Sequence, residues 1–356
     1  MNEGLRVPEW IKSAISIDDP KVQMLVDEVA AARVVYLGET NHFVHEKTDF
    51  RLWWLSQLGL RKRLVIGEEI AHLDGQEINA FLRDGDARHL DRVATFGYSG
   101  RKRTDRDDWP PVFKSSPYPH AGMRYEHERL YAAIRHKGAV ERFFGFDVDA
   151  DGAGSAEPVI GETLEDELMR LEAAGSTPRT QIESLRYLHL MAGATEFEQT
   201  RAAMAYREDV MKRRVDEVLA ATDPAHLIVL LAHAFHLAED DACFGSGAGI
   251  GPGGGQADSL GHYLTQDRRV DTRAVWMLCG EGTDSQPLTG LPNELRYPRR
   301  SLNRRLGAKL SDVALLRSGP RGMVGVGHLY SAVAEVELAR QADCVMFFPT
   351  VTPLQS

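Results

Sequence analysis

The chain has 356 residues, of which 43% are hydrophobic and 26% charged, values typical of a folded globular protein. Lys and Arg number 42 against 52 Asp and Glu, which gives a formal net charge of -10, so we expect no nucleic-acid partner. No apolar run reaches the length of a membrane span or of a signal peptide, so we expect no membrane association and a cytoplasmic location.

Short apolar runs recur along the chain, with helical segments between them. Continuous apolar strands that alternate with helices are typical of a mostly parallel sheet covered on both faces. The sequence therefore predicts an α/β fold, a mostly parallel central sheet flanked by helices. The expected strands are residues 33–37, 64–67, 142–146, 227–231, 273–278 and 344–348.

We expect one α/β catalytic domain over residues 1–356, with two additions inserted within it. Residues 161–221 alternate charged and apolar positions with no strand signal, which predicts a helical subdomain. Residues 100–122 form a long segment rich in Pro and aromatic residues, which predicts a lid-like loop over a ligand site. Trp109 and Tyr118 in this loop are candidate substrate-binding residues.

A glycine-rich stretch at residues 245–255 contains a formal GxGxxG pattern. No predicted strand leads into it, and Pro252 interrupts it, so we expect neither a dinucleotide nor any other cofactor.

Acidic and histidine side chains follow four of the predicted strands. Taken singly, such an acid is usually solvated and such a histidine usually structural. Because the carboxyl ends of parallel strands meet at one edge of a sheet, we expect these side chains to converge and to serve general acid–base chemistry. They are Glu39 and His42, Glu68 and Glu69, Asp147, and His233 and His236.

Several common catalytic motifs are missing from the sequence. It has no GxSxG nucleophile motif, no HExxH zinc motif and no GxxxxGK[ST] phosphate loop. If the protein is a hydrolase, we therefore expect water to be the nucleophile.

Three short motifs follow in order along the chain: GExxH at 38–42, GFD at 145–147 and AHxxH at 232–236. Between the last two lies RxDxM at 207–211, and Asn79 follows the acid after the second strand by ten residues. Together these motifs resemble the erythromycin esterase family over about residues 33 to 353. The resemblance implies a metal-independent hydrolase that opens an ester or lactone of a natural product, a small-molecule substrate, as in antibiotic resistance.

The resemblance also implies roles for individual residues. His42 would be the general base, and Glu39 and the acid after the second strand would orient it and the water. The spacing to Asn79 favours Glu69 for that acid.

Two further family positions match this sequence. Arg51 and His233 complete the catalytic set, and either Arg51 or a protonated His233 would stabilise the oxyanion. Arg51 has an alternative interpretation as a surface ion pair of its helix. Asp147 and His236 are candidate substrate-binding residues, each with a structural alternative.

Other functions stay open at this point. A biosynthetic enzyme could use the same His and Glu groups for cyclisation, elimination or acyl transfer, and the family's usual residues are replaced at Phe43, Arg214 and Ala234. A catalytically inactive binding protein is disfavoured because the acid–base set is intact. A zinc hydrolase is also open, because five residues offer metal-binding side chains, namely Glu39, His42, Glu69, His233 and His236.

Overall fold

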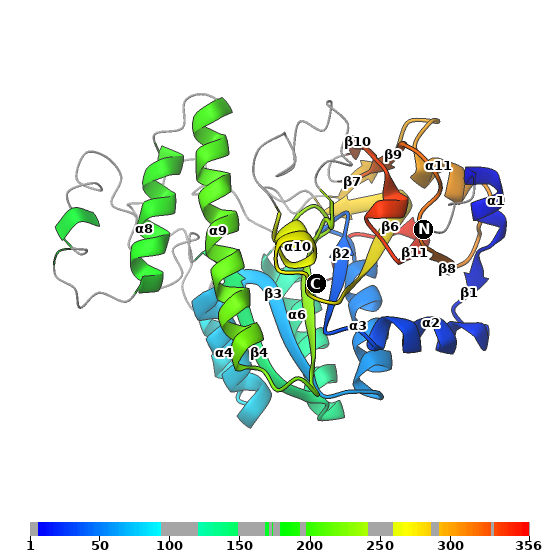
Figure 1. The fold of residues 1–356 in the computed structure, drawn as a ribbon. Coiled ribbons are helices and arrows are strands. Elements are labelled where there is room, and N and C mark those ends of the chain that lie inside the picture. Colours follow the sequence, from blue (N-terminus) through cyan, green and yellow to red (C-terminus); the bar gives the residue numbers. More distant parts are fainter. Residues whose placement is uncertain are drawn as a thin grey trace.

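The computed structural model has a central sheet with helices packed on both of its faces (Figure 1). This arrangement confirms the predicted fold class. The structure describes residues 6–93, 120–148, 168–170, 173, 179–192, 197–240, 259–285, 292–328 and 331–355.

The sheet follows the order β1-β8-β11-β6-β2-β5-β3-β4, and β7 pairs with β6. From β11 to β4 every neighbouring pair is parallel, whereas β8, β1 and β7 pair antiparallel with their neighbours. The strands β9 and β10 form a separate antiparallel hairpin. The strands are β1 Ile15–Ser16, β2 Val34–Glu39, β3 Leu64–Ala71, β4 Val140–Asp147, β5 Leu227–His233, β6 Thr272–Ser285, β7 Pro292–Leu295, β8 Ala314–Arg317, β9 Val324–Gly327, β10 Val333–Val336 and β11 Cys344–Val351.

The six predicted strands correspond to the six parallel strands of the sheet, and the antiparallel strands were not predicted. Short 3₁₀ turns cover Ala87–Arg92 and Leu338–Arg340, and a π-helical turn covers Tyr263–Asp267. No helix within the described ranges has the length and apolar content needed to cross a membrane. The α-helices are α1 Val7–Lys12, α2 Lys21–Ala30, α3 Glu46–Gly59, α4 His72–Asp84, α6 His120–Lys137, α8 Arg179–Ala192, α9 Phe197–Ala221, α10 Leu260–His262 and α11 Leu302–Gly307.

Alternate side chains of the buried strands enter two different cores. In β2, Val35 and Leu37 join the core that α2, α3, α4 and α6 cover, while Val34 and Tyr36 join the core under α9, α10 and α11. Since side chains in a strand alternate between faces, Glu39 at the end of β2 continues on the α3 face. The alternation thus fixes the face on which each polar residue at a strand end lies.

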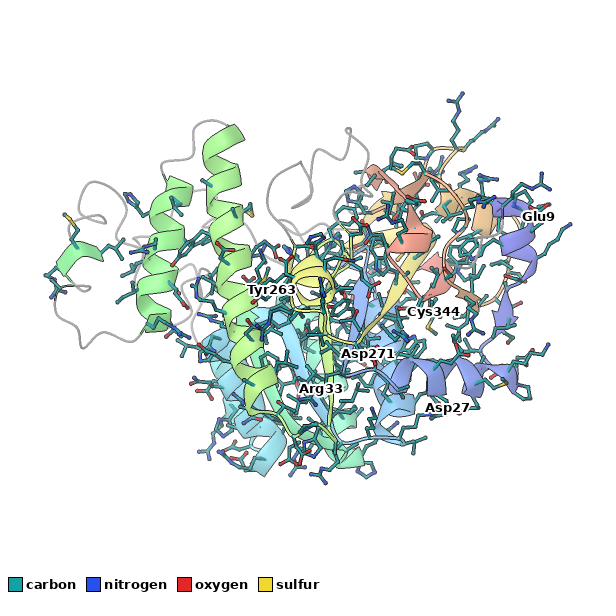
Figure 2. The ribbon with its side chains drawn as sticks, in the orientation of Figure 1. Glu9, Asp27, Arg33, Tyr263, Asp271 and Cys344 are labelled. Atoms are coloured by element: carbon teal, nitrogen blue, oxygen red, sulfur yellow. The ribbon has the colours of Figure 1, made fainter. Side chains whose placement is uncertain are left out.

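Arg33, which lies just before β2 at the amino edge of the sheet, fixes one end of α9 (Figure 2). Its guanidinium donates to the carbonyl oxygens of Thr222 and His226, both at 2.7 Å, just beyond the C-terminus of the helix. A cation there satisfies carbonyl groups that have no partner within a helix. This contact ties α9 to the sheet, so earlier turns of α9 reach the carboxyl edge in a fixed register.

The two predicted insertions are described only in part. Residues 120–122 of the predicted lid-like loop belong to the first turn of α6, and the rest of that loop, with Trp109 and Tyr118, lies outside the described residues. Within 161–221 the structure describes two long helices, α8 and α9, which lie side by side (Figure 1). A buried ion pair joins them, with Arg214 Nη2 at 2.9 Å from Glu183 Oε2.

The close approach of α4 to β4 gives a test of this packing. A Cβ atom added at Gly75 would lie 1.9 Å from the backbone nitrogen of Gly145, so the backbone of α4 or β4 would have to shift. We expect Gly75→Ala to lower the free energy of unfolding by at least about 2 kcal/mol, measured by urea denaturation. Gly307→Ala is the matched control, because the nearest atom there is 3.9 Å away. Equal stability of the two variants would contradict the close packing.

Candidate active site

The carboxyl edge of the sheet brings together residues from three neighbouring strands. Glu39 ends β2 and stands in register with His233, which ends β5. On the other side of β5, Glu68 of β3 stands in register with Leu231, and Glu69 follows it. Helix α3, which connects β2 to β3, carries Arg51 to the same edge.

Arg51 is shared between two carboxylates. Its Nη2 donates to Glu39 Oε1 at 2.9 Å and its Nη1 donates to Glu68 Oε1 at 2.5 Å. Burial alone would raise the pKa values of both acids, but the guanidinium outweighs burial and holds both below their usual range. Both carboxylates are therefore ionised near neutral pH.

His42 is oriented by Glu39. Its Nδ1 lies 3.0 Å from Glu39 Oε1, and because an ionised carboxylate only accepts, the Nδ1–H donates. The lone pair of a neutral His42 ring therefore lies on Nε2. The side chain is 27% exposed, so this nitrogen belongs to a ring that solvent can reach. Such a ring is suited to take a proton from water.

His233 lies beside His42, with the ring centroids 5.0 Å apart. Its Nδ1 accepts the backbone N–H of Phe235 at 3.3 Å, which leaves the proton of the neutral ring on Nε2. Burial, and after it the neighbouring His42, lowers the pKa of His233 well below its usual value. Nε2 is buried and has no hydrogen-bond partner among the described residues. The ring thus offers a free N–H donor next to His42.

A second arginine binds two carboxylates on the opposite face of the sheet. Arg207 of α9 donates to Glu69 Oε1 at 2.8 Å and to Asp147 Oδ1 at 2.7 Å. The other oxygen of Glu69, Oε2, accepts the backbone N–H of His233 at 2.8 Å. Glu69 therefore holds the end of β5 against α9.

His236 fills the space between Glu69 and Glu208. Its Nε2 lies 3.2 Å from Glu69 Oε1, and its Nδ1 contacts Glu208 Oε1. Both ring nitrogens face carboxylates, so both donate and the ring is an imidazolium. Burial opposes this charge, but Glu69 and Glu208 outweigh burial and raise the pKa of His236 to about 10.

All but two of the predicted site residues lie within the described part of the chain, at this edge. Arg51 is not a surface ion pair, since it is 3% exposed and lies between Glu39 and Glu68. Asp147 and His236 are each bound by neighbouring side chains. Glu68 and Glu69 both lie here, on opposite faces of the sheet, where Arg51 binds Glu68 and Arg207 binds Glu69. The preference for Glu69 stays a prediction. Trp109 and Tyr118 lie outside the described residues.

The structure adds residues that the motifs did not indicate. Glu68 also accepts from Tyr131 at 2.7 Å, and His127 Nε2 lies 3.1 Å from Glu68 Oε1. Lys47 is 3% exposed, and burial, followed by Arg51, lowers its pKa to about 8. One sequence signal was available for Lys47, which precedes Arg51 by four residues and so shares its face of α3.

Within the described ranges, no group of three or more His, Cys, Asp or Glu side chains is placed to hold a metal ion. The acids at the edge are bound by other partners instead. Arg51 lies between Glu39 and Glu68, and Arg207 lies between Glu69 and Asp147. A guanidinium in each of these positions supplies the positive charge that a cation would otherwise bring.

The sequence matches no protein-family model and no curated protein. Three solved structures share the fold. A succinoglycan biosynthesis protein aligns with a TM-score of 0.68 at 12% identity, covering 98% of this chain and 97% of that one. A mutant erythromycin esterase in its open conformation aligns with a TM-score of 0.65 at 16% identity, covering 99% and 98%. A protein from Bacillus cereus aligns with a TM-score of 0.56 at 13% identity, covering 98% of each chain. At these identities the likeness is one of fold.

The His236 pair gives a pH-dependent test. We expect His236→Asn to lower the free energy of unfolding at pH 7 by about 3 kcal/mol, because two buried carboxylates lose their imidazolium. The folded pKa, about 10, lies above the usual 6.5, so this stabilisation is complete below pH 6.5 and is lost as pH rises through about 10. Urea denaturation of the wild-type protein and His236→Asn from pH 6 to 10 measures the difference in free energy of unfolding. His226→Asn is the control, because His226 is half-buried. A difference that does not shrink toward pH 10 would contradict the assignment.

Proposed function

We propose that the protein is a metal-independent hydrolase of an ester or lactone, in which His42 activates water. The observation that carries the proposal is the 3.0 Å contact between His42 Nδ1 and Glu39, which leaves Nε2 as the basic nitrogen. The fold shared with an erythromycin esterase supports it, and so does the motif order GExxH, GFD and AHxxH.

In the proposed reaction, a water molecule attacks the ester carbonyl carbon while its proton moves to His42 Nε2. The C–O π electrons move to the carbonyl oxygen, and the resulting oxyanion accepts from the free Nε2–H of His233. The tetrahedral intermediate then expels the alkoxide, which takes the proton back from His42. The products are a carboxylic acid and an alcohol, or one hydroxy acid from a lactone.

Glu39 stabilises the imidazolium that His42 becomes during this reaction. Arg51 keeps Glu39 ionised and fixed, so we assign it a positioning role in place of direct oxyanion binding. His233 acts as a neutral donor, because its lowered pKa keeps the ring uncharged at pH 7. Glu69 positions His233 through the backbone N–H.

A first experiment measures the contribution of His42. We expect the wild-type protein to hydrolyse at least one of three probes, p-nitrophenyl acetate, δ-valerolactone or erythromycin. His42→Ala is expected to reduce turnover by at least about 100-fold, which is the low end of the range for a lost general base. The thermal stability of the variant is expected to stay the same. His226→Ala, at the amino edge of the sheet, is the control and keeps full activity. A folded His42→Ala protein with normal turnover would falsify the role of His42.

The same assay in ¹⁸O-labelled water separates hydrolysis from the biosynthetic alternative. Hydrolysis places one solvent oxygen in the acid product, whereas cyclisation, elimination or acyl transfer to another molecule places none there. If the product carries no label but its formation still depends on His42, the site catalyses proton transfer without hydrolysis.

A second experiment concerns the zinc alternative. We expect activity to survive chelation with EDTA and dialysis, because guanidinium groups rather than a cation neutralise the carboxylates at this edge. Metal content is measured by plasma mass spectrometry on the purified protein. Stoichiometric zinc, with activity lost on chelation and regained with zinc, would move His42 and His233 from acid–base roles to metal ligation.

A further inference from the structure

His328 is a third imidazole, which lies beside His233 as His42 does. It follows β9 directly, and its ring centroid lies 6.4 Å from that of His233 and 5.1 Å from the ring of Phe235. The residue is 5% exposed. No motif of the sequence pointed to it, because it comes from a hairpin outside the parallel sheet.

No hydrogen bond or ion pair of the His328 ring nitrogens occurs in the described part of the chain, and these nitrogens are not among the fully buried unpaired atoms. Burial lowers the pKa of His328 to about 4, so the ring is neutral near pH 7. A neutral imidazole carries one N–H donor and one acceptor nitrogen. Although the residue as a whole is 5% exposed, these nitrogens are open to contact, and the ring lies beside His233, so a ligand at that site can reach them.

The backbone around His328 is held firmly by neighbouring elements. Asn303 Oδ1 accepts the N–H of Gly327 at 2.6 Å, and Asn303 Nδ2 donates to the carbonyl oxygen of Cys279 in β6, also at 2.6 Å. The N–H of His328 itself donates to the carbonyl oxygen of Ala332 at 2.9 Å. The hairpin is thus fixed to the central sheet next to the residue that carries the ring, which favours a defined contact over a mobile side chain.

We propose that His328 determines specificity by hydrogen bonding a neutral oxygen of the substrate, a hydroxyl or a carbonyl, next to the ester group that His233 binds. The inference rests on the proposed function and adds the substrate class to it. His233 and His328 are both uncharged, so this side of the site offers no full charge to a carboxylate or ammonium group. A hydroxyl group fits best, since it both donates and accepts, as the imidazole does.

Paired esters that differ by one hydroxyl group test the inference. We expect the wild-type protein to hydrolyse the p-nitrophenyl ester of 2-hydroxybutyric or 3-hydroxybutyric acid with a kcat/KM at least about tenfold above that of p-nitrophenyl butyrate. His328→Leu is expected to abolish this preference while hydrolysis of the butyrate ester changes little. His328→Gln keeps a neutral donor and acceptor and is expected to retain part of the preference for the hydroxy ester. The control His226→Leu is expected to retain all of that preference.

Each outcome decides the inference. A wild-type protein without the preference overturns it, with no reliance on the folding of any variant. If His328→Leu keeps the preference for the hydroxy ester, the inference is also overturned. In that case, hydrolysis that still depends on His42 leaves the proposed function unaffected. If His328→Leu fails to fold, the retained preference in His328→Gln supports the inference, and its loss in a folded His328→Gln overturns it. Absence of hydrolysis that depends on His42 overturns the proposed function and this inference together.

Discussion

The site depends on one buried contact, the guanidinium of Arg51 shared between Glu39 and Glu68. Glu39 ends β2 and Glu68 lies within β3; these strands lie on either side of β5, and α3, which carries Arg51, is the connection between them. A single side chain therefore ties together two strands and the helix that joins them. Because Arg51 keeps Glu39 ionised, the Nδ1–H of His42 has a fixed acceptor, and the basic lone pair lies on the other nitrogen.

The opposite face repeats this arrangement with different elements. Arg207 of α9 is shared between Glu69 and Asp147, and Glu69 in turn holds the backbone of His233. The register of α9 is fixed at its far end, where Arg33 binds the carbonyl groups beyond the helix C-terminus. The position of His233 thus depends on a contact at the other edge of the sheet. Breaking either arginine pair leaves a buried carboxylate without compensation, which is far more costly than losing a surface ion pair.

The parallel strands were predictable, because strands buried on both faces are continuously apolar, and a short run such as 227–231 is typical of such a strand. The polar residues at the strand ends followed from the same rule. The antiparallel strands were not predictable, since β8 has four residues and β1 has two, too short for a periodic signal. The preference for Glu69 over Glu68, which rested on the spacing to Asn79, stays a prediction. The alternation along β3 puts the two carboxylates on opposite faces, and each face holds an arginine, Arg51 beside Glu68 and Arg207 beside Glu69.

The charged and neutral groups of the site have separate tasks in the proposed mechanism. Arg51, Arg207 and the His236 imidazolium are each bound by carboxylates, so their charges position neighbouring groups and are not free for a substrate. Lys47 adds positive charge near Glu39 and Glu68, and its lowered pKa reflects burial beside Arg51. The rings of His233 and His328 are neutral, and Nε2 of His233 has no hydrogen-bond partner among the described residues. On this proposal, selection of the substrate rests on hydrogen bonds to uncharged oxygens, and the ion pairs maintain the geometry in which His42 activates water.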